Sequence, residues 1–352
     1  MTGRTLSRCG LVWRSLRITI AIIASGLLLG AIPGAAQLSP SVTPPLAIEI
    51  VSERITAFDV RDPSLRQFGL LEFRGGLVLR SPHPGFGGIS AIRVASDGAH
   101  FIALSDKGWW FRGRLLYEGT RPSGIADAEM APMLGANGKP LAARGWYDTE
   151  AIAVDGDTLY VGIERVHQIV RFNYGKEGLL ARGRAIELPS ALRSLPANRG
   201  LEALVFVPRG LPLAGTLIAI SERGLDEAGN ISGFLIGGPT PGSFAVRRNS
   251  NYDITDAALL PGGDVLLLER RFGWDSGLAV RVRRIALGDI KPGALVDGAV
   301  LFGADLGYEI DNMEGLSVHR SAGGETVLTL ISDDNFSTVQ RTLLLQFVLA
   351  EP

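Results

Sequence analysis

The chain has almost no cysteine and lacks the short motifs that mark the commonest hydrolase and nucleotide-binding sites. Its single cysteine is Cys9, so the sequence offers no pair of cysteines for a disulfide within the chain. It contains no Gly-x-Ser-x-Gly, Ser-x-x-Lys, His-Glu-x-x-His, Cys-x-x-Cys or Gly-Lys-Ser/Thr segment. These absences exclude the usual signatures of serine hydrolases, zinc proteases and phosphate-binding loops. A fold without disulfides depends on its hydrophobic core, which a chain of this length can supply.

Long apolar runs are also absent, except near the beginning of the chain. Four arginines there precede an apolar run at 18–32, and the small residues of Pro-Gly-Ala-Ala follow at 33–36. This arrangement predicts a secretory signal peptide at 1–36, cleaved after Ala36, and an exported, periplasmic or secreted domain at 37–352. An uncleaved membrane anchor is the alternative, although the run is shorter than the roughly 20 residues of a spanning helix. No later segment predicts a membrane span.

Charge of neither sign is in large excess. The formal net charge is −1, and removal of the leader with its four arginines would change it to −5. A mildly acidic surface gives no electrostatic basis for binding nucleic acid. We therefore expect a small-molecule ligand, no nucleic-acid partner and a monomeric protein.

A degenerate internal repeat is the most informative feature that is present. Short runs rich in Val, Ile and Leu recur between Gly, Pro and Asp, which is typical of an all-β fold. Five similar segments align, at 88–92, 147–154, 199–207, 252–260 and 312–318. Each is followed by a turn and a second strand, and the units start 52 to 62 residues apart. Such a period is typical of propeller blades, because one small sheet buries its faces only against neighbouring blades.

Chain length divided by this period predicts a single β-propeller of about six blades, each a four-stranded antiparallel sheet. In this prediction, strands at 47–53 and 77–80 form the sixth blade with the final strand at 342–349. Closure of that kind would leave no exposed sheet edge. A seven-bladed propeller and a pair of packed sheets stay open as alternatives, because repeats are hard to count at the chain ends.

Acidic residues recur where the first strand of each unit begins and where the second strand ends. These positions are neighbours in an antiparallel hairpin, so the sequence predicts pairs of acids. The predicted pairs are Glu150 with Glu164, Glu202 with Glu222, Asp256 with Glu269, and Glu314 with Asp333. Rotation of equivalent blades about one axis would bring all the pairs to one mouth of the central channel. The alternative is that these acids hold the scaffold through hydrogen bonds and ion pairs.

Clustered carboxylates need positive charge among them, from arginine or from a bound cation. Calcium prefers about six to eight oxygen ligands, so all eight acids are candidate ligands for Ca²⁺. Within this set, Glu150, Glu202 and Glu314 are the candidate catalytic residues. The candidate substrate-binding residues are Arg199, Arg223, Arg270 and His83. Arginine suits bidentate contacts with an oxyanion, and His83 lies in a rigid, glycine-rich loop. The alternative is that these four side chains are only solvated or packed.

Several of these segments together resemble the phytase-like family of exported bacterial proteins. The matching segments are Gly87-Gly88-Ile-Ser, Ser105-Asp106-Lys-Gly, Asp148-Thr-Glu150-Ala-Ile, Gly200-Leu-Glu202-Ala-Leu, Asp253-Ile-Thr-Asp256, Asn312-Met-Glu314-Gly-Leu and Asp333-Asp334-Asn335-Phe336. The resemblance covers roughly residues 87–335 and implies a propeller fold with phosphoester hydrolysis. Characterised β-propeller phytases use calcium to bind phosphate and activate water, but their Asp-Asp-Pro-Ala-Ile-Trp segment is missing here. This departure counts against phytate as the substrate.

Two functions are therefore compatible with the sequence. The first is metal-assisted hydrolysis of a phosphoester at the carboxylate-lined mouth. The alternative is a non-catalytic periplasmic propeller that binds a ligand or partner and holds structural calcium. A propeller fold by itself does not decide between them.

Overall fold

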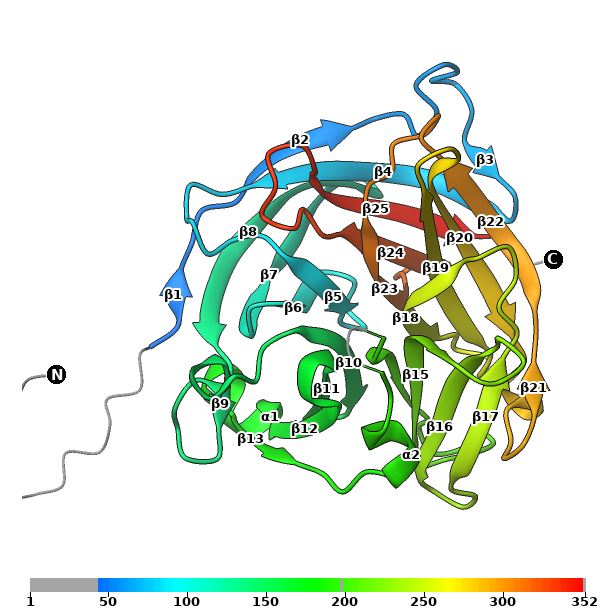
Figure 1. Ribbon diagram of the computed structural model, residues 1–352. Helices are drawn as coiled ribbons and strands as arrows, with labels where there is room; N and C mark the ends of the chain where they lie inside the picture. The colour runs from blue at the N-terminus through cyan, green and yellow to red at the C-terminus, as the bar shows by residue number, and fades with distance from the viewer. Residues whose placement is uncertain (1–43, 197–198, 351–352) are drawn as a thin grey trace, which may run out of the picture. The chain divides into compact units, whose positions relative to one another are not determined.

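The five repeated segments form the innermost strands of five sheets. In the computed structural model, which describes residues 44–196 and 199–350, these strands are β5 (Ile89–Val94), β10 (Thr149–Asp155), β14 (Leu201–Phe206), β18 (Asp253–Leu259) and β23 (Met313–Arg320). Each contacts the next and β23 contacts β5, so they form a closed ring around one axis (Figure 1). These residues thus form a single, mostly β propeller, and the predicted leader at 1–36 lies outside the described residues.

Each sheet grows outward from its innermost strand, mainly by antiparallel pairing. Blade 1 adds β6 (His100–Ser105), β7 (Trp109–Glu118), β8 (Arg121–Pro132) and β1 (Leu46–Ala47). Blade 2 adds β11 (Thr158–Ile163), β12 (Gln168–Asn173), β13 (Arg182–Ala185) and, in parallel, β9 (Leu134–Gly135). Blade 3 adds β15 (Thr216–Leu225), β16 (Ile231–Gly237), β17 (Gly242–Val246) and, in parallel, β21 (Leu295–Val296). Blade 4 adds β19 (Val265–Gly273), β20 (Gly277–Ile285) and β22 (Ala299–Asp305).

Blade 5 joins strands from both ends of the described chain. It adds β24 (Thr326–Ser332), β25 (Thr342–Leu349), β4 (Leu71–Arg80), β2 (Val51–Ile55) and β3 (Gln67–Phe68). In Figure 1 the red strand β25 lies beside the light-blue strand β4, with which it pairs along its whole length. The predicted count of six blades is therefore wrong, since the described residues form five. The N-terminal strands build no sheet of their own, because β4 pairs its backbone with the free edge of β25.

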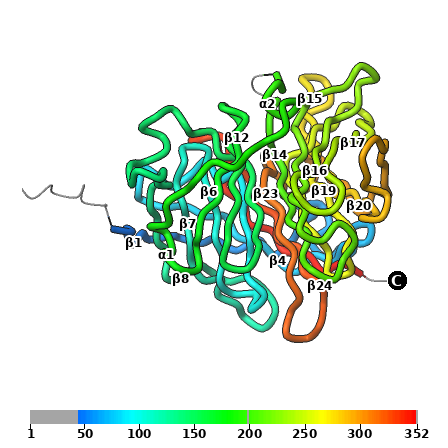
Figure 2. The backbone as a smooth tube through the Cα atoms, turned by 90° about the horizontal axis from the view of Figure 1, so that it is seen from below, coloured from blue at the N-terminus to red at the C-terminus, as the bar shows by residue number. Residues whose placement is uncertain are grey.

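Short helices occupy some of the connections between strands. They are α1 (Tyr174–Glu177), α2 (Ser190–Arg193) and the 3₁₀ turns η1 (Leu141–Arg144), η2 (Glu164–Val166), η3 (Gly178–Leu180) and η4 (Leu287–Asp289). None of the helices within 44–196 and 199–350 has the length and hydropathy needed to cross a membrane. Figure 2 shows the connecting loops gathered at the two ends of the strands, which is where side chains from different blades can meet.

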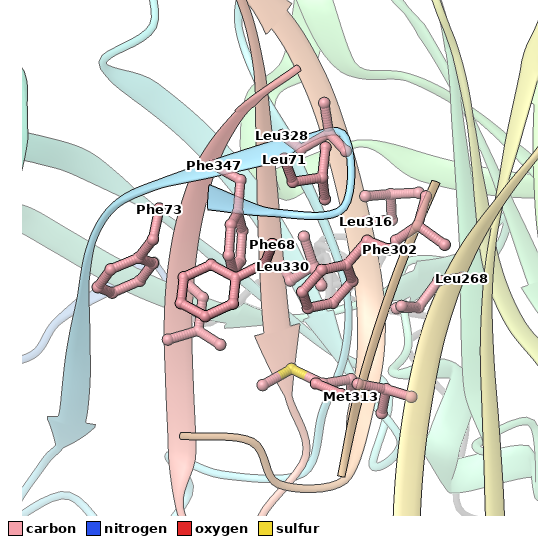
Figure 3. Close-up of a cluster of buried hydrophobic side chains, with 14 of the residues drawn as sticks. Phe68, Leu71, Phe73, Leu268, Phe302, Met313, Leu316, Leu328, Leu330 and Phe347 are labelled. Carbon is pink, nitrogen blue, oxygen red and sulfur yellow. The ribbon is translucent and has the colours of Figure 1, made fainter. Parts of the chain in front are cut away.

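Hydrophobic clusters fill the interfaces between neighbouring blades. Between blades 4 and 5, for example, Phe302, Met313 and Phe347 pack together and are nearly inaccessible to water (Figure 3). Similar clusters join blades 1 and 2, 2 and 3, 3 and 4, and 5 and 1. Both faces of each sheet are covered, so strands such as β24 are buried at every position. This packing holds the ends of the innermost strands in fixed positions around the axis.

Candidate functional site

All five innermost strands carry an irregularity at the same place. The pairing register between the first and second strand of each blade shifts by one residue there, which is the signature of a β-bulge. The residues skipped by the pairing are Ser90, Glu150, Glu202, Thr255 and Glu314. A bulge releases one residue from the regular alternation of the strand, so its side chain can be directed independently of its neighbours. Three blades place a glutamate at this position.

The other two blades place a hydroxyl at the bulge. Ser90 Oγ donates a hydrogen bond to the Thr149 carbonyl at 2.6 Å, and Thr255 Oγ1 donates one to the Met313 carbonyl at 3.0 Å. Each of these bonds links an innermost strand to the innermost strand of the next blade. Blades 1 and 4 therefore use the bulge to fasten the ring, whereas blades 2, 3 and 5 use it to present a carboxylate.

The three bulge glutamates share one end of the axis with five further acids, and we call this set the carboxylate mouth. Its members are Asp106, Asp148, Glu150, Glu164, Glu202, Glu222, Glu314 and Asp333. They lie close enough for the charge of one to raise the pKa of the next. Three of the four predicted hairpin pairs meet here, namely Glu150 with Glu164, Glu202 with Glu222, and Glu314 with Asp333.

Glu164, Glu202 and Glu222 form the tightest group within the mouth. One carboxylate oxygen from each lies within 4.8 Å of the others. Glu164 follows β11 and accepts a hydrogen bond from the Gly200 backbone N–H at 2.8 Å. Glu202 is only 8 % exposed, yet among the described residues it accepts no hydrogen bond and forms no ion pair. Arg270 acts on Glu202 only through its charge, without a direct contact, so the oxygens of this group remain free to bind a cation.

Burial and mutual repulsion raise the pKa values of these acids. Burial is the larger cause and lifts the pKa of Glu150 and Glu202 well above its usual range, with further increases from neighbouring carboxylates. It also raises the pKa of Glu222 and of Asp333 to about 7, although Arg223 and Arg270 oppose the rise at Glu222. A bound cation would relieve the part of each rise that neighbouring carboxylates cause, whereas the larger part, caused by burial, only disfavours the charged form of each acid.

Arginine supplies part of the missing positive charge. Arg270, from β19, donates hydrogen bonds to the carboxylate of Glu314 and to the side-chain oxygen of Asn312. Its guanidinium also lies 3.7 Å from Glu222. Arg223 contacts Asp253 at 2.5 Å and Glu222 at 3.9 Å. Lys107 pairs with Asp106 at 2.6 Å. Arg165 also opposes the rise in the pKa of Asp148, so eight carboxylates share four nearby cationic side chains and outnumber them two to one.

The fourth predicted pair, Asp256 with Glu269, does not form. The bulge in β18 falls on Thr255, so Asp256 lies one position further along the strand than the bulge glutamates of the other blades. Glu269 lies at 0 % exposure between Arg281 and Arg283, with nitrogen to oxygen distances of 2.7 and 2.6 Å. The structure thus places Glu269 in a buried ion pair of blade 4, away from Asp256.

Asp256 instead pairs with Arg93 on the axis of the propeller. The two guanidinium NH groups of Arg93 lie 2.7 and 3.0 Å from the carboxylate oxygens of Asp256. They also donate to backbone carbonyls of four innermost strands, those of Ile92, Leu204, Ala257 and Leu316. This arrangement ties four of the five blades together at the centre.

Replacing Asp256 with Ala is expected to destabilise the protein by about 3–5 kcal/mol, because Arg93 would be left buried without its counter-ion. The free energy of unfolding in urea measures the effect. The matched control is Glu53→Ala, which removes an exposed ion pair with Arg80 and is expected to cost less than about 1 kcal/mol. Equal stability of the two variants would contradict the axial role of Asp256.

The opposite end of the channel is a cavity of about 570 Å³ with largely apolar walls. It is lined by the last residues of the innermost strands, including Ala153, Val205, Ala258 and Val318, with Arg93 among the lining side chains. The cavity contains none of the acids of the carboxylate mouth. The two ends of the axis therefore differ sharply in chemistry.

Among the described residues, two of the predicted substrate-binding residues make no contact with the carboxylate mouth. Arg199 is exposed in the loop before β14. His83 folds back on its own loop, where its Nδ1 accepts a hydrogen bond from the Gly85 N–H at 3.0 Å. Arg223 and Arg270, by contrast, lie beside Glu222.

Sequence reasoning did not assign roles to several residues that the structure places at the site. Asp106 and Asp148 belong to the mouth, Asn312 orients Glu314, and Arg93 closes the axis. Asp106 could have been included, because it ends the second strand of its unit just as Glu222 does. Arg93 gave no signal, since its contacts come from strands more than 100 residues away in the chain.

A family profile described as "Phytase-like: Esterase-like activity of phytase" matches residues 84–336, which includes every acid of the carboxylate mouth. A comparison with curated proteins finds no match.

Similar solved structures are distant. They include the PQQ-bound aldose sugar dehydrogenase of Streptomyces coelicolor, at 14% identity and TM-score 0.40, covering 86% of this chain and 100% of that chain. A putative glucose dehydrogenase of Thermus thermophilus has 15% identity and TM-score 0.33, covering 85% and 99%. A chain of the Nidogen/Laminin complex has 12% identity and TM-score 0.38, covering 81% and 98%. Likeness at this level supports no conclusion about activity.

Proposed function

The chain belongs to the phytase-like family through residues 84–336, and from this premise we propose that it is a metal-assisted phosphoester hydrolase acting at the carboxylate mouth. The observation that carries the proposal is Glu202, a carboxylate that is 8 % exposed, lacks a partner among the described residues and lies within 4.8 Å of two others. Such a site suits a hard divalent cation such as Ca²⁺, which prefers oxygen ligands.

Glu164, Glu202 and Glu222 are the residues that would hold the cation, with Glu150 and Glu314 nearby. When bound, a divalent cation neutralises phosphate oxygens and lowers the pKa of water. The reaction is a hydrolysis, in which a water oxygen forms a bond to phosphorus and the bond from phosphorus to the alcohol oxygen breaks. One proton of the water leaves on the alcohol, so no other reactant is needed.

The arginines of the mouth give the chain its means of orienting an ester. Arg270 is held by Asn312 and Glu314, and its second NH group lies 3.7 Å from Glu222, too far for a hydrogen bond. Arg223 is more exposed, with about two fifths of its side chain accessible. A guanidinium beside the carboxylate group can bind phosphate oxygens with two parallel hydrogen bonds. Burial of the mouth strengthens both that contact and the attraction of the carboxylates for a cation.

The test is a panel of phosphomonoesters, phosphodiesters and carboxylesters, assayed with Ca²⁺ or Mn²⁺ and then with a chelator. Turnover of a phosphoester is expected with the cation, loss of at least about 100-fold with the chelator, and recovery when the cation is restored. A rise in melting temperature with Ca²⁺ but no turnover of any ester would overturn the proposal. That result would favour a non-catalytic propeller that binds calcium for stability.

A further inference from the structure

The hairpin between β19 and β20, whose backbone is drawn in Figure 1, exposes two large aromatic side chains near its tip. Phe272 is 65% exposed and Trp274 is 97% exposed, and their rings meet edge to face with centroids 5.6 Å apart. Exposed aromatic side chains grouped in this way commonly mark a binding surface.

This aromatic hairpin is a continuation of the strand that carries Arg270 into the mouth. The pairing of β19 with β20 is regular from Val265 to Gly273, so residues two apart point to the same face. Arg270 and Phe272 therefore share a face of β19, with Phe272 about 7 Å further out. A phosphate bound by Arg270 would thus direct the rest of an ester towards Phe272 and Trp274.

The charge of the mouth restricts the kind of ester that fits. Eight carboxylates face four nearby cationic side chains, those of Lys107, Arg165, Arg223 and Arg270, so when all eight acids are ionised one bound divalent cation would still leave negative charge in excess. A substrate with many phosphates would be repelled by this excess. An ester with one phosphate and an uncharged organic group meets the least repulsion and can place that group on the apolar surface.

We propose that Phe272 and Trp274 bind the organic group of the substrate, so that the preferred substrate is a phosphoester of an apolar or aromatic alcohol. The inference rests on the proposed function, because it assumes that the phosphate lies at Arg270. The aromatic hairpin would determine specificity and would take no part in bond breaking.

The test compares 1-naphthyl phosphate with methyl phosphate in the full chain with Ca²⁺. Phe272→Ala and Trp274→Ala should each lower the ratio of the two kcat/KM values by about tenfold relative to the wild type, because the naphthyl ring loses its platform. The matched control is Val300→Ala, an exposed apolar residue of β22 in the same blade, which should leave the ratio unchanged. An unchanged ratio in both hairpin variants overturns the inference and leaves the proposed function intact.

A binding measurement keeps the inference testable without turnover. Calorimetry with 1-naphthylmethylphosphonate and methylphosphonate should show about tenfold tighter binding of the naphthyl compound, and Trp274→Ala should abolish the difference. Equal binding of the two compounds, or binding of neither, overturns the inference.

Co-sedimentation with phosphatidylcholine and phosphatidylglycerol vesicles tests a lipid surface as the occupant. If Trp274→Ala abolishes vesicle binding but leaves the preference for the naphthyl phosphonate intact, the inference is overturned, and the hairpin binds a membrane instead.

Discussion

Replacing Glu202 with Gln is expected to weaken binding of Ca²⁺ by at least about 100-fold and to lower kcat/KM for a phosphoester by a similar factor. The substitution keeps the shape of the side chain but removes one negative charge from a group of three carboxylates within 4.8 Å. The same change should make the cation-free protein more stable by about 1–3 kcal/mol, because a buried carboxylate without a partner opposes folding. Weaker binding together with higher stability is the signature of a site built for a cation.

The matched control is Glu227→Gln, an exposed glutamate in the loop between β15 and β16 of the same blade. It should change neither cation affinity nor stability. Calorimetric titration measures the affinity, and urea unfolding with a chelator measures the stability. Wild-type affinity for Ca²⁺ and Mn²⁺ in Glu202→Gln would remove the proposed cation site.

The second large effect is on stability as a function of pH. Without a cation, the protein is expected to lose on the order of 5 kcal/mol of stability between pH 4 and pH 7.5. Asp333 and Glu222 have a pKa of about 7 in the folded protein, against about 4 in an unfolded chain. Between these values the folded state binds more protons than the unfolded state, so stability falls as pH rises and levels off above the folded pKa.

The groups that face these two acids account for the direction of the shifts. Glu222 faces Arg223, Arg270, Asp253 and Glu314, and Asp333 faces Glu314, Asp106 and Asp334. Carboxylates with a lowered pKa, such as Asp97 and Asp297, have the opposite effect, but only at lower pH. The effects of the lowered and the raised pKa values therefore fall in different pH ranges and can be measured separately.

Melting temperatures measured from pH 4 to pH 8 with chelator, and again with saturating Ca²⁺, check this prediction. The cation should restore stability above pH 7, because it binds the deprotonated acids. Asp333→Asn should reduce the decline by about half, whereas Glu227→Gln should not change it. Stability that rises with pH in the presence of chelator would contradict the raised pKa values.

Much of the fold could be predicted from the repeat. The five aligned segments became the five innermost strands, and the last strand pairs with N-terminal strands as closure required. The number of blades was overestimated, because the residues before the first repeat were assigned a sheet of their own. Strands β2 and β4 carry no repeat signal that shows which sheet they join.

At the site, hairpin geometry predicted the pairs of acids correctly where the first acid occupies the bulge of its innermost strand. It placed Glu202 beside Glu222 and Glu314 beside Asp333. It failed for Asp256, since the repeat was aligned on the acid although the bulge in β18 falls on Thr255. Side chains alternate along a strand, so a difference of one residue changes the direction of the carboxylate.

The amino-acid sequence by itself determined the β-propeller class, the repeated strands and the acids that hairpins bring together, because these depend on local periodicity and on pairing between neighbours in the chain. Only the tertiary structure decided the five-bladed closure, the position of each bulge and the Arg93 to Asp256 pair on the axis. These features depend on contacts between distant segments, and whether a buried charge finds a partner is settled by the side chains that surround it in space.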